Sequence, residues 1–95
     1  MQLVTALVAP SRIDAVLRGL RAFGLCGWNL SSTYAMDTGP MTFIRLELVA
    51  ANADTADVVR VISRAASPAT PRVWVTPVDL VVRVRTGERG PDAVQ

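Results

Sequence analysis

Two arginines near the C-terminal end, Arg83 and Arg85, have the type and spacing that most clearly suggest chemistry. Side chains alternate along a β-strand, so two residues that are two apart place both guanidinium groups on one face. The planar N–H donors of arginine match the oxygen pairs of a phosphate, and both groups could converge on one phosphate. A solvated or ion-paired couple of arginines is the alternative that this spacing leaves open.

Residues for catalysis or metal binding are scarce in this sequence. It contains no histidine, which removes the commonest general base and metal ligand. One cysteine, Cys26, and scattered acidic residues form no pattern typical of a metal site. A lone cysteine cannot form an intramolecular disulfide, which favours a reducing cytoplasm. We therefore expect a cytoplasmic protein that is not an enzyme and has neither catalytic residues nor a metal.

Composition restricts the remaining classes of function. A chain of 95 residues is long enough for one domain, 1–95, and its tail from about residue 87 is expected to be mobile. The chain is 51% hydrophobic, which is high for this length and favours association with further copies of itself. Its net charge of +2 is too small to indicate nucleic-acid binding. No apolar run is long enough to predict insertion into a membrane.

The elements that must position the arginines follow from hydrophobic periodicity. Apolar or alternating runs predict strands over residues 3–8, 27–34, 42–50, 72–76 and 81–85. In the third strand the apolar residues Ile44, Leu46 and Leu48 should face one way, and Arg45 and Glu47 the other.

Helical spacing predicts two helices between these strands. The first is expected to begin at a Ser11 cap and to end at Gly24. The second should be capped by Asn52 or Asp54 and run to about Ala66. The order strand–helix–strand, given twice, predicts an α+β fold: a ferredoxin-like βαββαβ sandwich, whose antiparallel sheet carries both helices on one face.

Four segments, placed within this order of strands and helices, resemble the PII signal-transduction (nitrogen regulatory protein P-II-like) family. They are RVRTGERG at residues 83–90, LVTA at 3–6 ahead of Pro10, the glycines at 24 and 27, and LELV at 46–49. The resemblance implies a homotrimer that binds adenine nucleotides in clefts between subunits. It also implies a protein target, of unknown identity, to which the trimer reports energy or metabolite status.

The same resemblance implies a set of nucleotide-binding residues. Matched position by position, the phosphate contacts are Arg83, Arg85 and Arg72, and the base and ribose pocket is lined by Leu7, Asn29 and Val49. The ligand would be ADP, AMP or ATP, and no cofactor is implied.

The chain departs from the family in two loops. The long T-loop, with its modified tyrosine and its magnesium-binding glutamine, is reduced to residues 35–40, and Phe43 replaces the lysine that holds 2-oxoglutarate. The glycine-rich B-loop is replaced by SPATP at residues 67–71, where Pro68 and Pro71 remove two N–H donors. We expect a divergent member that does not bind 2-oxoglutarate and binds nucleotide weakly.

Three hypotheses of function remain. The first is a nucleotide-responsive regulator, favoured by Arg83 and Arg85. The second is a trimeric interaction scaffold that has lost nucleotide binding, favoured by the two prolines. The third, an enzyme of the ferredoxin-like monooxygenase type, is disfavoured because no catalytic constellation is visible. Trp28 and Trp74 are expected to be anchors of the core or of a subunit interface.

Overall fold

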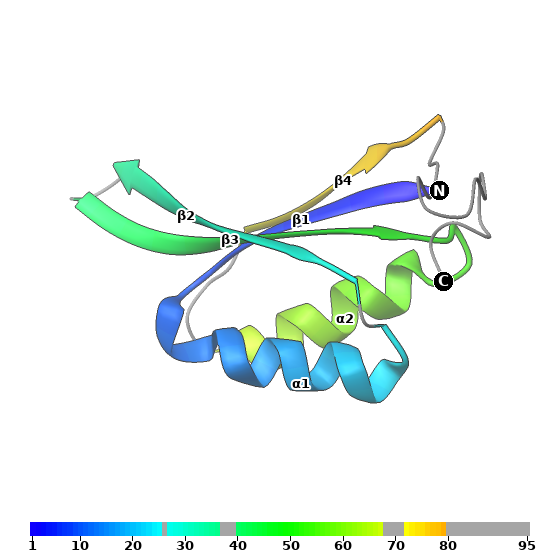
Figure 1. Ribbon diagram of the computed structural model, residues 1–95, viewed down its shortest axis with the longest axis horizontal. Coiled ribbons are helices and arrows are strands. Elements are labelled where there is room, and N and C mark those ends of the chain that lie inside the picture. Colours follow the sequence, from blue (N-terminus) through cyan, green and yellow to red (C-terminus); the bar gives the residue numbers. More distant parts are fainter. Residues whose placement is uncertain (26, 37–39, 68–71, 80–95) are drawn as a thin grey trace.

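The computed structural model describes residues 1–25, 27–36, 40–67 and 72–79, and Figure 1 shows their arrangement. The elements, in chain order, are β1 (Gln2–Val8), the 3-10 turn η1 (Pro10–Arg12), α1 (Ile13–Phe23), β2 (Asn29–Met36), β3 (Pro40–Ala50), α2 (Thr55–Ala66) and β4 (Arg72–Pro77). The four strands form one antiparallel sheet with the order β2-β3-β1-β4. Both helices lie against the same face of this sheet (Figure 1). The predicted ferredoxin-like sandwich is therefore confirmed.

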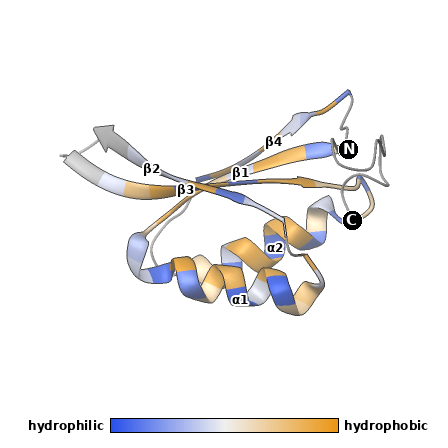
Figure 2. Ribbon diagram, viewed as in Figure 1, coloured by the Kyte–Doolittle hydropathy of each residue, from blue (hydrophilic) through white to orange (hydrophobic). Residues whose placement is uncertain are grey.

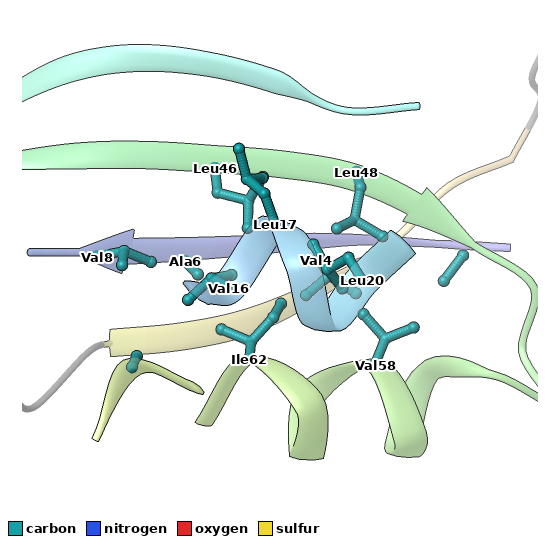
Figure 3. Close-up of a cluster of buried hydrophobic side chains, with 12 residues drawn as sticks. Val4, Ala6, Val8, Val16, Leu17, Leu20, Leu46, Leu48, Val58 and Ile62 are labelled. Atoms are coloured by element: carbon teal, nitrogen blue, oxygen red, sulfur yellow. The ribbon is translucent and has the colours of Figure 1, made fainter. Parts of the chain in front are cut away.

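The core lies between the sheet and the two helices (Figure 3). Strand alternation directs every second side chain of β1 and β3 towards the helices, and buried hydrophobic residues occupy these positions. Figure 2 shows hydrophobic residues along both strands and on both helices. The members of the core come from four elements: Val4, Ala6 and Val8 from β1, Val16, Leu17 and Leu20 from α1, Leu46, Leu48 and Ala50 from β3, and Val58, Ile62 and Ala66 from α2. The predicted inward direction of Leu46 and Leu48 is confirmed.

The end of α1 follows the prediction, whereas its beginning does not. Gly24 has a φ of 109°, in the left-handed region that glycine adopts readily, and its N–H donates to carbonyl oxygens of the last turn. Ser11, however, lies inside η1, and Arg12 is the residue that precedes the helix. Pro10 starts this 3-10 turn, so the Ser11 cap was wrong: no side-chain cap bond forms there.

The predicted side-chain cap of α2 was also wrong, because neither candidate residue makes a capping hydrogen bond. Asp54 precedes the helix but its side chain makes no capping hydrogen bond. The other candidate, Asn52, instead accepts a hydrogen bond from the N-terminal ammonium of Met1 at 2.8 Å. Thr55 donates its hydroxyl to the carbonyl oxygen of Ala51 at 3.2 Å.

Other boundaries shift by a few residues, and some predictions fall outside the described residues. Strand β2 begins at Asn29, after Trp28, and β3 begins at Pro40 rather than at residue 42. The predicted strand over 81–85, the tail and the SPATP prolines lie outside the part of the chain that the structure describes. No helix within the described ranges is long and apolar enough to cross a membrane.

Candidate functional site

The sheet face that the helices do not cover carries the candidate site, and we call it the open face. Its members are the side chains between the core positions of each strand: Leu3, Thr5 and Leu7 from β1, Asn29, Ser31 and Thr33 from β2, Phe43, Arg45, Glu47 and Val49 from β3, and Arg72, Trp74 and Thr76 from β4. Residues in register across an antiparallel pair share a face, so the pairing of the four strands defines this set. It combines apolar, aromatic and charged groups.

All four described residues of the predicted site lie on the open face. Leu7 is in register with Arg72, so these residues are direct neighbours across β1 and β4. Asn29 is in register with Glu47, and Val49 follows two residues later on the same strand, which makes it the diagonal neighbour of Asn29. The predictions for Arg83 and Arg85 fall outside the described residues.

These four residues form two groups that one chain does not bring together. Asn29 lies on the edge strand β2 and Arg72 on the opposite edge strand β4. Three strand spacings separate these edges, which is about 14 Å across the sheet. Leu7 and Val49 lie at distant points as well, because Leu7 pairs with Arg45, four residues before Val49. One chain therefore presents the four residues as two separate groups on the open face.

Charged and aromatic side chains occupy the area between the two groups. The Nε atom of Arg45 lies 3.3 Å from a carboxylate oxygen of Glu47. The guanidinium carbon of the same arginine lies over the ring of Trp74, 5.7 Å from its centroid. This distance allows a cation–π contact. Sequence reasoning placed Arg45 and Glu47 on the outer face but missed the contact with Trp74, which depends on the register of β1 with both of its neighbours.

One buried hydroxyl on the open face has no hydrogen-bond partner among the described residues. Thr5 is only 1% exposed, and its Oγ1 atom makes no hydrogen bond with any residue in the described part of the chain. Its neighbours in register are Glu47 on one side and Trp74 on the other. A buried hydroxyl without a hydrogen bond is unfavourable, and such groups in a folded protein call for a reason. Nothing in the sequence alone indicated this residue.

The two tryptophans occupy different environments. Trp28 is half-buried, packs against the core and lies 5.3 Å from the guanidinium carbon of Arg21. Trp74 is 39% exposed on the open face, so within one chain it is not a core residue. The helices do not cover the ring of Trp74, because they lie on the other face of the sheet. Strand β4, which carries Trp74, is also an edge strand. The subunit-interface alternative for Trp74 stays a prediction.

Binding is the chemistry that this arrangement supports. Two arginines on one face can contact oxyanions, apolar Leu7 and Val49 can contact a flat ring, and the amide of Asn29 can both donate and accept hydrogen bonds. Across the described ranges, no group of three or more histidine, cysteine, aspartate or glutamate residues is placed to hold a metal ion.

Comparison with known proteins gives one consistent result. The family model described as nitrogen regulatory protein P-II matches residues 1–88. Two nitrogen regulatory P-II proteins, from Azospirillum brasilense and from Cereibacter sphaeroides, are each 26% identical over 114 residues, which cover 99% of this chain and all of the relative. The crystal structure of Arabidopsis thaliana PII bound to citrate superposes with a TM-score of 0.91 at 30% identity, covering 99% of this chain and 89% of that one.

Proposed function

We propose a function from the premise that the chain belongs to the nitrogen regulatory protein P-II family, whose family model its residues 1–88 match. Members of this family are regulatory signal-transduction proteins. We infer that this member is a cytoplasmic homotrimer that binds an adenine nucleotide in clefts between subunits. Through this ligand it modulates a partner protein, and it is not an enzyme.

The separation of the site residues on the open face is the observation that carries this proposal. Leu7 and Arg72 form one group on β1 and β4, and Asn29 and Val49 form the other on β2 and β3. A cyclic assembly repeats one contact between different surfaces of neighbouring subunits. In such a trimer the first group of one subunit can face the second group of the next. Each cleft then contains one complete set of residues.

The exposed side chains of the open face support association. Trp74 is 39% exposed, and Leu3, Leu7 and Val49 are half-buried, on the sheet face that neither α1 nor α2 covers. Aromatic and aliphatic groups of this kind favour the buried centre of an interface. A second subunit that covers them would bury the apolar surface that one chain leaves exposed.

The chemistry of the two groups suits an adenine nucleotide. Arg72 supplies planar donors for phosphate oxygens, and Leu7 beside it supplies an apolar surface for the base. In the facing group, the Asn29 amide can form hydrogen bonds to ribose or base, and Val49 provides a second apolar wall. Arg83 and Arg85, the strongest motif in the sequence, would complete the phosphate contacts.

Isothermal titration calorimetry against AMP, ADP and ATP tests the proposal directly. We expect wild-type protein to bind weakly, with little preference for ATP, and the Arg83→Ala/Arg85→Ala variant to lose this binding. Arg60→Ala/Arg64→Ala, which removes two exposed arginines from α2, is the matched control and should bind like wild type. Equal binding by the Arg83→Ala/Arg85→Ala variant would place the nucleotide elsewhere. Citrate belongs in the same panel, because the Arabidopsis relative was crystallised with it bound.

A trimeric interaction scaffold without nucleotide binding is the second candidate. The replacement of a glycine-rich loop by residues 67–71, with prolines at 68 and 71, favours it because backbone N–H donors are lost. Light scattering should give the mass of three chains under both candidates. A trimer that binds no adenine nucleotide at millimolar concentration would support the scaffold, and a stable monomer would contradict both.

A further inference from the structure

Arg45 extends across the open face towards the strand that carries Arg72. In the sheet, Arg45 on β3 is in register with Leu7 on β1, which is in turn in register with Arg72 on β4. The guanidinium carbon of Arg45 lies 5.7 Å from the ring centroid of Trp74, a residue of β4. Trp74 and Arg72 are two apart on one strand and share its face. The head group of Arg45 therefore lies between Glu47 on its own strand and the ring of Trp74, on the face that also carries Arg72.

The contacts of Arg45 hold its side chain but leave most of its donors uncommitted. Its Nε atom faces Glu47 at 3.3 Å, and its guanidinium group lies over the ring of Trp74. Within the described residues, neither of its Nη atoms makes a hydrogen bond, and the side chain is 40% exposed. A guanidinium group has five N–H donors in a fixed plane, and four of them belong to the Nη atoms. These four can serve an oxyanion.

Thr5 supplies an independent observation at the same place. It lies on β1 between Glu47 and Trp74, and the contact between Arg45 and Trp74 passes over this strand. Its Oγ1 atom is buried and has no hydrogen-bond partner in the part of the chain described. Because Thr5 is only 1% exposed, its hydroxyl gains an anion as a partner only if the side chains that cover it move aside when the anion binds.

We propose that Arg45 and Thr5 form an oxyanion subsite on the open face, which takes the phosphate end of the bound nucleotide. The inference rests on the proposed function and adds two residues to its site. The guanidinium group of Arg45 binds the phosphate oxygens through its Nη atoms, and the Thr5 hydroxyl donates to the same group. Arg45 thereby supplies donors in place of the two backbone N–H groups that Pro68 and Pro71 lack.

The alternative is that Arg45 only stabilises the sheet, through its contacts with Glu47 on β3 and with Trp74 on β4. In that case its loss would disturb the sheet and would affect all ligands equally. A role in phosphate binding predicts selectivity instead, because the effect should grow with the number of phosphates and vanish for a ligand without phosphate. Ligands that differ only in phosphate content therefore separate the two roles.

The experiment compares Arg45→Gln with wild type by calorimetry on the full chain, with adenosine, AMP, ADP and inorganic pyrophosphate as probes. Arg64→Gln removes the same charge from the exposed surface of α2 and is the matched control. We expect Arg45→Gln to weaken ADP binding roughly ten- to hundredfold, as for a lost hydrogen bond to a charged group, and to leave adenosine unchanged. Arg64→Gln should bind every probe like wild type. Light scattering confirms that all three proteins have the same assembly.

Two results would overturn the proposal: ADP binding by Arg45→Gln equal to that of wild type, or equal losses for ADP and adenosine. The pyrophosphate arm separates this inference from the proposed function. If wild type binds no adenine nucleotide but binds pyrophosphate through Arg45, the nucleotide function fails and the oxyanion subsite stands. If wild type binds none of the probes, both fail.

Thr5 variants provide a second test that does not depend on Arg45. Thr5→Val keeps the shape of the side chain and removes the hydroxyl, so it should weaken ADP and pyrophosphate severalfold. Thr5→Ser keeps the hydroxyl and should retain most of the affinity. Binding by Thr5→Val equal to that of wild type would remove Thr5 from the subsite.

Discussion

The two faces of the sheet differ in how far the side chains on them are buried and paired within one chain. On the face covered by the helices, Val4, Val8 and Leu46 are fully buried among other apolar side chains. On the open face, Arg45 retains free N–H donors within the described residues, Thr5 has a buried hydroxyl without a partner, and Trp74 is 39% exposed. Both faces are built from the same strands by simple alternation.

This difference separates the residues that stabilise the fold from those that are available for binding. Every second residue of β1 and β3 is committed to the core, so its replacement should reduce stability. The residues of the open face other than Thr5 are half-buried or exposed, and the predicted nucleotide residues Leu7, Asn29, Val49 and Arg72 all lie on this face. Substitutions on the open face should therefore change binding more than folding.

The largest expected effect is the loss of a core leucine. Leu46→Ala should lower the free energy of unfolding by about 2–5 kcal/mol, because the side chain is fully buried and its removal leaves a cavity. Leu7→Ala makes the same truncation on the open face, where the side chain is half-buried, and should cost less than half as much. Urea denaturation of both variants measures the difference, and equal losses would contradict the contrast between the faces.

A second prediction concerns the tight packing of the two helices under the sheet. A Cβ atom added at Gly19 would meet Cγ1 of Val61 at 2.9 Å, so Gly19→Ala forces α1 and α2 apart or moves that side chain. Overpacking should outweigh the better helix propensity of alanine, for a net loss of about 1 kcal/mol. Adding Val61→Ala should relieve the clash and make alanine at 19 favourable.

Gly27→Ala is the matched control for this substitution, since no atom of the described residues, its chain neighbours apart, lies within 4 Å of its added Cβ atom. It should change stability by less than about 0.5 kcal/mol. If Gly19→Ala were equally neutral in thermal unfolding, the helix layer would be looser than the geometry indicates.

The sequence was sufficient to predict the two faces of the central strand β3. The alternation of Leu46 and Leu48 with Arg45 and Glu47 has only one arrangement that buries apolar groups, and the structure has that arrangement. Helix ends were harder to predict because several polar residues compete for the same backbone groups. Asn52, for example, was a plausible cap but contacts the N-terminus, 51 positions earlier in the chain.

The open face could be predicted only in part. The resemblance placed Leu7, Asn29, Val49 and Arg72 in one site, and the structure places all four on the open face. The contact of Arg45 with Trp74 could not be predicted, because it depends on the register of three strands that are distant in sequence. A long-range contact of this kind leaves no local pattern in the sequence.

A third prediction uses the hydroxyl of Thr5, which has no hydrogen-bond partner within the described ranges. Without ligand, Thr5→Val should raise the free energy of unfolding by about 1 kcal/mol, because it removes a buried polar group that has no described partner. Thr76→Val, on an exposed position of the same face, should change it by less than about 0.5 kcal/mol. A thermal shift in ligand-free buffer measures both variants. Destabilisation by Thr5→Val would show that the hydroxyl has a partner after all.

The smallest expected effect is the absence of a response to 2-oxoglutarate. The resemblance places Phe43 where the family has the lysine that holds this dicarboxylate, and the sequence contains no lysine at all. Removing a carboxylate from water without a charged partner is unfavourable, so calorimetry with ATP and magnesium should detect no saturable binding. Arg45, two residues along the same face, is the nearest cation on this strand that could replace the lysine. If 2-oxoglutarate did bind and Arg45→Gln abolished it, the open face would have kept its dicarboxylate site through a different residue. If Arg45→Gln left that binding unchanged, the ligand would lie outside the open face. The assignment of binding to the open face and of stability to the covered face would then be wrong.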